Sequence, residues 1–338
     1  MGGIDRLFQL TYPHLQSTDI IEMVMIEQET VQQAIEILDK AIQESGSEGG
    51  TILVMEPNTG EILGMATNPR MDLNEYWRVS EFFRKDQPFN LGVQSYEPGS
   101  VFKVITMAAA LDSRTVKPDT IFVDTGSINV GGITIRNWNW GAWGPQDMTG
   151  CLQHSLNVCM AWLATEMKAG IFYDYLNAFG FGHFTGVELS GEVSGRLKMP
   201  GHGDWYEADL GTNSFGQGIT TTPVQMLMAI SAVANNQGNV MVPHVVHSVI
   251  NQGRQFEIAP QVAGTPISAK TAKTLSNMLA VSLEQEASDA LIEGYRVAGK
   301  TGTAEIATEF GYTSNLTNAS FVGWGPVDDP RFLVYVWL

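Results

Sequence analysis

The chain has 338 residues, of which 44% are hydrophobic and 16% are charged, so it holds ample apolar material for a globular core. Its 36 acidic and 19 basic residues give a formal net charge of -17 without a long charged run, which argues against nucleic acid or an anionic membrane face as a partner. No stretch reaches the roughly 18 apolar residues of a membrane span, and the N-terminus lacks the order of a signal peptide. We therefore expect a soluble chain.

The hydrophobic pattern predicts an alternating α/β layout without an internal repeat. A strand is expected at Ile20–Ile26, and apolar residues at helical spacing predict an amphipathic helix at Gln28–Ile42. A cluster of turn formers joins the apolar runs Thr51–Met55 and Glu61–Thr67, which indicates a β-hairpin. Residues 68–97 look rich in loops.

The next element is a strongly apolar helix at Ser100–Leu111, opened by Pro98 and Gly99. Ser100 and Lys103 are polar exceptions, and their spacing places them on one face. An apolar setting lowers the pKa of a lysine, which would let Lys103 take the proton of Ser100. The helix N-terminus also favours developing negative charge. Taken alone, this pattern more often reflects an N-capping serine and a lysine that reaches solvent, so other motifs must decide.

A second polar motif interrupts a helix-like stretch at Met148–Met167. Ser155 and Asn157 lie two positions apart, which on a continuous helix would send them to nearly opposite sides. If both serve one site, they occupy a turn between two helices. A loop serine and a capping asparagine are the simpler explanation when this motif is considered alone.

The two cysteines of the chain are Cys151 and Cys159. Two are too few for a disulfide framework or a four-ligand zinc site, and the six histidines show no metal-ligand spacing. We expect buried free thiols, no metal and no cofactor.

The third motif lies in Arg296–Ile306, which reads as a strand bordered by glycines. Gly302 is expected to let a substrate backbone lie alongside, because a glycine in a strand often marks a close approach by a ligand. Thr301 and Thr303 offer hydroxyls, and Lys300 supplies positive charge. Strand alternation puts Lys300 on the opposite face from the threonines, so it acts either from the cleft floor or around an edge.

A competing interpretation uses the same residues, because Gly294–Thr301 fits the G-x-x-x-x-G-K-[ST] phosphate-loop pattern. A phosphate loop must open a helix, yet the residues after Lys300 include Gly302 and alternate like a strand. Only 37 residues follow Thr301, too few for the parallel sheet of such a fold. The pattern is therefore not expected to bind nucleotide.

The three motifs occur in a fixed order along the chain, and this ordered set is far more specific than any one of its members. They are Ser100-Val-Phe-Lys103, Ser155-Leu-Asn157 and Lys300-Thr-Gly-Thr303. The set resembles that of the penicillin-binding protein and serine β-lactamase superfamily, and within it the transpeptidase domain of a class B penicillin-binding protein. The similarity covers roughly residues 20–338 and extends to Val54–Ala66, Tyr96–Lys103, Gly216–Gln225 and Ala298–Ala304.

This resemblance implies an α/β (α+β) fold of the β-lactamase and transpeptidase type. A central antiparallel sheet would be flanked by helices, and an all-helical subdomain would hold the nucleophile helix. Residues 49–338 would form the transpeptidase domain, and residues 1–48 would be a remnant of an N-terminal pedestal or linker. The family usually continues beyond the strand-like run Arg331–Leu338 with another strand and a closing helix, so the domain is expected to be truncated there.

The resemblance also implies D,D-transpeptidation of peptidoglycan stem peptides. Ser100 would attack the penultimate D-Ala carbonyl, and Lys103 would serve as its base. Ser155 would relay a proton to the departing D-Ala amine, Asn157 would hold the donor peptide, and Lys300 would supply electrostatics to the relay and the substrate.

On the strand side, Thr301 and Thr303 would bind the terminal carboxylate of the substrate, beside Gly302. The backbone N–H groups of Ser100 and Thr303 would form the oxyanion hole. β-Lactams would acylate Ser100 by the same route.

The implied partners are stem peptides ending in D-Ala-D-Ala, and β-lactams. The full-length form would be membrane-anchored on the extracytoplasmic side, with a glycosyltransferase partner. Alternatives on the same fold are a β-lactam-sensing receptor domain, a D,D-carboxypeptidase and a β-lactamase. A β-lactamase needs a group that activates water, and no second carboxylate is placed by a motif; Glu166 is expected to be a surface residue.

Overall fold

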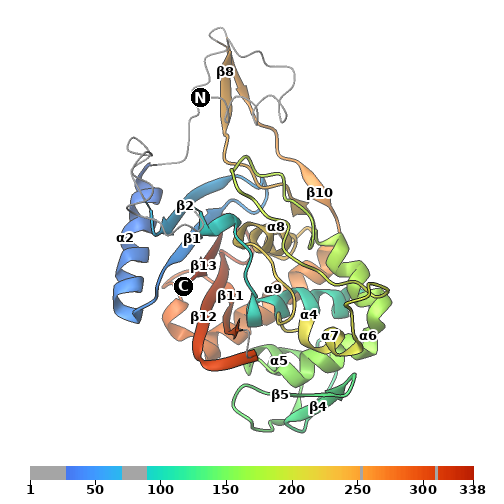
Figure 1. Cartoon of the computed structure of the whole chain (residues 1–338). Coiled ribbons are helices and arrows are strands. Elements are labelled where there is room, and N and C mark those ends of the chain that lie inside the picture. The colour runs from blue at the N-terminus through green and yellow to red at the C-terminus, as the bar shows by residue number, and fades with distance from the viewer. Residues whose placement is uncertain (1–27, 71–89, 252–253, 309–310) are drawn as a thin grey trace.

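The computed structural model describes residues 28–70, 90–251, 254–308 and 311–338. At its centre is an antiparallel sheet with the strand order β11-β12-β13-β1-β2 (Figure 1). Its strands are Gly50–Met55 (β1), Ile62–Asn68 (β2), Ala298–Thr308 (β11), Gly311–Gly325 (β12) and Phe332–Trp337 (β13). The third motif therefore lies on β11, an edge strand of this sheet.

Helices flank the sheet and form a second group beside it (Figure 1). The α-helices are Gln28–Ser45 (α2), Lys103–Asp112 (α4), Met148–Gln153 (α5), Asn157–Ala178 (α6), Glu207–Asn213 (α7), Pro223–Ala234 (α8) and Ala269–Glu286 (α9). Short 3-10 turns span Leu91–Val93 (η2), Gly99–Phe102 (η3) and Ser288–Ala290 (η4). The α+β class predicted from the resemblance, with its central antiparallel sheet, is confirmed.

Among the described residues, four two-stranded sheets lie outside the central sheet. They are Phe122–Asp124 (β3) with Gly144–Gln146 (β6), Ser127–Val130 (β4) with Ile133–Arg136 (β5), Val240–Met241 (β7) with Val262–Gly264 (β10), and Ser248–Asn251 (β8) with Arg254–Glu257 (β9). The β4–β5 hairpin lies below α5 at the bottom of the view in Figure 1.

Side-chain alternation along β1 divides the core between the two faces of the sheet. Ile52 packs with Leu38 of α2 on one face. Leu53 and Met55 belong to the larger cluster on the other face. Period-two alternation is what a sheet covered on both sides requires. The predicted helix at Gln28–Ile42 is confirmed and runs to Ser45.

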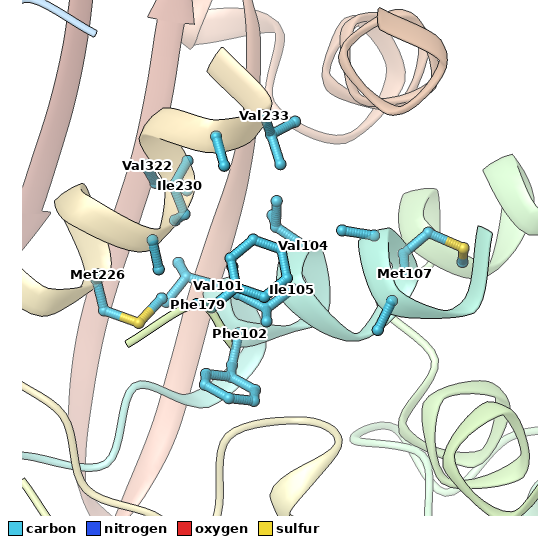
Figure 2. Close-up of a cluster of buried hydrophobic side chains, with 14 of the residues drawn as sticks. Val101, Phe102, Val104, Ile105, Met107, Phe179, Met226, Ile230, Val233 and Val322 are labelled. Carbon is cyan, nitrogen blue, oxygen red and sulfur yellow. The ribbon is translucent and has the colours of Figure 1, made fainter. Parts of the chain in front are cut away.

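The nucleophile helix is anchored in the larger cluster. Figure 2 shows that Val101, Phe102, Val104 and Ile105 lie among side chains of α8 and the sheet, namely Met226, Ile230, Val233 and Val322. All eight of these side chains have a relative exposure of 0%. Because each fully buried side chain of this size contributes about 1.5–3 kcal/mol, the start of α4 is held firmly against the sheet.

Most predicted elements are present with small changes at their ends. The hairpin corresponds to β1 and β2, and the apolar run at the C-terminal end of the chain is β13. The helix expected from Ser100 begins one residue earlier as the 3-10 turn η3, and α4 proper starts at Lys103. The strand expected at Ile20–Ile26 lies outside the described residues.

The prediction of free thiols is wrong, because Cys151 and Cys159 form a disulfide. Cys151 lies on α5 and Cys159 on α6, and the turn between these helices brings their Cα atoms to 6.1 Å. A disulfide needs Cα atoms roughly 4.4–6.8 Å apart. A count of two cysteines excludes a framework of several bridges but not a single local bridge across a turn.

Across the described ranges, none of the helices combines the length and apolarity that a bilayer crossing requires.

Candidate active site

The nucleophile turn is fixed by close backbone crossings before Ser100. Gly99 has a φ of +60° and donates its N–H to the carbonyl of Gly216 at 3.0 Å. A Cβ atom at Gly216 would lie 2.3 Å from the carbonyl oxygen of Gly99, which no real contact permits. The segment before Ser100 therefore needs glycine on both sides of this crossing, and Ser100 emerges from it at the wall of the cleft.

Lys103 joins the first motif to the second. Its buried Nζ donates hydrogen bonds to the Ser155 carbonyl oxygen at 2.6 Å, Ser155 Oγ at 3.0 Å and Asn157 Oδ1 at 2.8 Å. The protonated amine donates to all three acceptors, whereas the neutral amine has two hydrogens and must give up one of these bonds. The expectation that Ser155 and Asn157 serve the same site as Lys103 fits this arrangement.

Burial lowers the pKa of Lys103 well below its ordinary value, and the positive charge of Lys300 lowers it further. Glu286 acts in the opposite direction. Desolvation disfavours the charged form of a lysine, so the neutral amine becomes accessible. A neutral amine can accept the proton of a serine hydroxyl within hydrogen-bond reach, and the serine hydroxyl within reach of Lys103 Nζ in the structure is that of Ser155.

The second motif is shaped by a sharp turn. Ser155 adopts a φ of +51°, and Asn157 is the first residue of α6. Asn157 Nδ2 also donates to the carbonyl of Arg136 on β5 at 3.1 Å. The predicted turn between two helices is confirmed, and Asn157 links Lys103 to the β4–β5 hairpin.

On the strand side, Lys300 is fully buried and its Nζ lies 2.6 Å from Glu286 Oε1 at the end of α9. Thr301 Oγ1 donates to the same carboxylate oxygen and lies 3.4 Å from Lys300 Nζ. Burial lowers the pKa of Lys300, whereas the Glu286 carboxylate raises it. Lys300 does not itself line the cleft, but its buried Nζ comes up beside Thr301, which does; this placement fits the alternative in which it acts from the cleft floor.

At Gly302 the space beside the missing side chain is filled by the protein itself. A Cβ atom here would clash with Ser320 Oγ and lie 3.1 Å from the backbone nitrogen of Val101. The close approach of the turn that carries Ser100 therefore requires this glycine, and a substrate backbone alongside Gly302 stays a prediction. Thr303 is exposed and lines the cleft, and its carbonyl lies 3.0 Å from where a Cβ of Gly99 would be.

A cleft of about 960 Å³ connects these residues. Its walls include Ser100, Ser155, Asn157, Thr301 and Thr303. Lys103 and Lys300 sit beneath it, each with 0% exposure. The three motifs, spread over about 200 positions of sequence, converge here as the resemblance predicts.

Sequence reasoning missed two features of this cleft. The first is Glu286, which no motif marks. The second is an aromatic rim made by Trp138, Trp140 and Trp143. Trp143 stacks on His154 with ring centroids 3.7 Å apart. The high tryptophan content of this segment was visible in the sequence, but its position beside the cleft depends on the β4–β5 hairpin.

The structure also bears on the alternatives. β11 continues through and beyond Lys300 without opening a helix, so the rejection of a phosphate loop is confirmed. Glu166 is exposed on α6, as expected. Within the ranges that the structure describes, His, Cys, Asp and Glu residues form no group of three suited to a metal ion.

Comparison with known proteins supports one family. The model of the penicillin binding protein transpeptidase domain matches residues 50–338. Stage V sporulation protein D of Bacillus subtilis is 35% identical over 327 residues, which cover 94% of this chain and 49% of that protein. The chain thus spans about half the length of this curated relative.

Solved structures are similar over almost the whole chain. Penicillin-binding protein 3 of Mycobacterium tuberculosis, in complex with aztreonam, matches with a TM-score of 0.85 and 26% identity, covering 95% of this chain and 72% of that one. The D,D-transpeptidase domain of a peptidoglycan glycosyltransferase from Eggerthella lenta also has a TM-score of 0.85 at 26% identity, covering 98% of this chain and 81% of that one.

Proposed function

Because this chain belongs to the class B penicillin-binding protein transpeptidase family, we propose that it is a serine-type peptidoglycan D,D-transpeptidase. The observation that carries the proposal is the contact of Lys103 Nζ with Ser155 and Asn157, at the cleft into which Ser100 opens. Burial makes Lys103 a base that can lose its charge, and the two contacts hold its Nζ next to residues that line the same cleft as Ser100.

In the first half-reaction, Ser100 Oγ attacks the carbonyl carbon of the penultimate D-Ala while Lys103 accepts the hydroxyl proton. The peptide bond then breaks, and the terminal D-Ala leaves with a proton passed through Ser155 to its nitrogen. The hydrogen bond between Lys103 and Ser155 Oγ, at 3.0 Å, supports this relay. An acyl ester on Ser100 remains.

In the second half-reaction, the amine of another stem peptide attacks the ester carbon. Its proton goes to Lys103 and then to Ser100 Oγ, which leaves as the free hydroxyl. A new amide crosslink has formed, and the enzyme is regenerated. Asn157 holds the donor peptide during both steps.

Substrate binding falls to the strand side of the cleft. Thr301 and Thr303 bind the terminal carboxylate, and Lys300 supplies positive charge from below. The backbone N–H groups of Ser100 and Thr303 form the oxyanion hole. The close packing of the nucleophile turn against β11 supports this pairing, since it leaves Gly99 and Thr303 in contact distance.

β-Lactams acylate Ser100 by the same route. The longer protein to which the chain corresponds is anchored in the membrane and works with a glycosyltransferase, on the extracytoplasmic side. The disulfide between Cys151 and Cys159 supports this location, since such bonds persist in oxidising compartments. Residues 49–338 are the transpeptidase domain, and residues 1–48 are the remnant of a pedestal or linker; the family match from residue 50 supports this division.

A β-lactamase requires a base for water, and the cleft does contain the carboxylate of Glu286. Its Oε1 already accepts from Lys300 and Thr301. Oε1 is thus engaged and Oε2 is buried, so the carboxylate offers no open oxygen to a water molecule, which favours slow hydrolysis.

The proposal is tested with a stem peptide ending in D-Ala-D-Ala, with and without a second peptide that offers a free amine. A transpeptidase releases D-Ala and forms the amide-linked product only when the amine is present. Release of D-Ala without that product would indicate a D,D-carboxypeptidase instead. Acylation by a β-lactam with no turnover of either kind would indicate a sensor domain. Ser100→Ala is the control for each reaction.

A further inference from the structure

Glu286 lies where the proposed function requires an empty anion-binding site. Its Oε1 accepts one hydrogen bond from Lys300 Nζ at 2.6 Å and another from Thr301 Oγ1. Thr301 is one of the two threonines expected to bind the carboxylate of a substrate or β-lactam, and Lys300 is expected to supply the positive charge below it. The Glu286 side chain is 16% exposed and lines the cleft together with Ser100.

The hydroxyl group of Thr301 cannot donate to Glu286 and to a ligand at the same time. A threonine hydroxyl has one hydrogen to donate. In the structure that hydrogen goes to Glu286, while Lys300 Nζ approaches the hydroxyl oxygen at 3.4 Å. Thr301 cannot donate to a ligand carboxylate at the same time.

Glu286 is also poorly placed for stability alone. It is the last residue of α9, where the helix dipole disfavours a negative charge. Its second oxygen, Oε2, is buried and has no hydrogen-bond partner among the described residues. Both features cost free energy of folding. A charge at the unfavourable end of a helix and a buried oxygen without a partner are found together mainly at functional sites.

From these contacts we propose that Glu286 is a resident carboxylate that occupies the anion-binding donors of the cleft, and that a ligand carboxylate must displace it to reach Thr301. The proposal rests on the proposed function and adds a determinant of specificity to it. Displacement exchanges one carboxylate for another on the same donors, so Lys300 keeps a counter-charge throughout. Glu286 is the last residue of α9 and is followed by Ala287 with non-helical angles, so no further turn of the helix covers it.

The test compares benzylpenicillin with its methyl ester, which lacks the anionic charge. Rate constants for acylation are measured by intact-protein mass spectrometry on the native chain, Glu286→Gln and Glu286→Ala. The readout is the ratio of the acid rate to the ester rate, which does not depend on the fraction of folded protein. Glu284→Gln is the matched control, because it removes the same charge from an exposed position of the same helix.

We expect the acid-to-ester ratio to rise about tenfold in Glu286→Gln and to rise in the same direction in Glu286→Ala, the size expected for one hydrogen bond to a charged group. The ratio should stay within about twofold of the native value in Glu284→Gln, as for an exposed charge. An unchanged or lowered ratio in both Glu286 variants, with Ser100 still acylated, would overturn the role of Glu286 and leave the proposed function standing. Absence of acylation in the native chain would overturn the proposed function and the role of Glu286 with it.

Discussion

Lys103 Nζ, at the start of α4, lies 2.8 Å from Asn157 Oδ1, at the start of α6. This one hydrogen bond joins two motifs separated by 54 positions in the sequence. It also aims the amine of Lys103 at the turn that carries Ser155. The proposed chemistry depends on this junction, and the predictions below test it and the packing that supports it.

Acylation of the protein by benzylpenicillin should depend on pH through Lys103. The protonated amine cannot accept a proton, so the rate should fall as pH drops through the pKa of Lys103. Because burial and Lys300 lower that pKa from 10.5, the rate should rise with pH and level off well below pH 10.5. The check is the acylation rate constant measured from about pH 5 to about pH 10, on both sides of neutrality. A rate that is still climbing steeply at the upper end of this range would contradict the assignment of the base.

Replacing Ser155 with alanine should slow acylation by roughly 10²–10⁴-fold, the usual contribution of a positioned proton-transfer group. The hydroxyl lost is the one 3.0 Å from Lys103 Nζ. The matched control is Ser45→Ala at the end of α2, a serine that does not line the cleft. Equal rates for the two variants would mean that Ser155 takes no part in the relay.

Gly302→Ala should destabilise the fold by about 1–3 kcal/mol, as overpacking does, because the new methyl group meets Ser320 Oγ and the nucleophile turn. Gly170→Ala provides the control. Its Cβ would meet nothing within 4 Å and its φ lies outside the left-handed region, so alanine there should stabilise by about 0.4–1 kcal/mol through the unfolded chain. Urea denaturation of both variants gives the two free energies of unfolding. If Gly302→Ala left the free energy of unfolding unchanged, the contact between β11 and η3 would be looser than described.

Reduction of the bond between Cys151 and Cys159 should lower the free energy of unfolding by about 2–3 kcal/mol, the loop-closure contribution expected for a separation of 8 residues. The measurement is urea denaturation with and without a reductant. The double variant Cys151→Ala, Cys159→Ala serves as the control and should not respond to the reductant. If the native chain is equally insensitive, the two thiols are not bonded in solution.

Local patterns predicted the elements that carry the site. Helical spacing located α2, turn formers located the hairpin of β1 and β2, and glycines with alternation located β11. The break before Asn157 was predicted because a continuous helix could not turn both Ser155 and Asn157 toward one site. Each of these signals lies within a short stretch of chain.

What the sequence could not predict depends on contacts between distant segments. Glu286 ends a helix 14 positions before Lys300, and only the packing of α9 on β11 brings them together. The disulfide depends on how sharply the chain turns at Ser155. The surroundings of Gly302 are set by Val101, about 200 positions away, so a local pattern could show that something approaches closely but not what.

Every step of the proposed mechanism requires Ser100 to be the nucleophile. This is tested by intact-protein mass spectrometry after incubation with benzylpenicillin, on the native chain and on Ser100→Ala. Ser100 is partly exposed at the cleft, so its replacement should leave the fold intact. We expect a persistent adduct of one drug molecule on the native chain and none on Ser100→Ala. An adduct of equal yield on both proteins, or no adduct on the native chain, would show that Ser100 does not have this role.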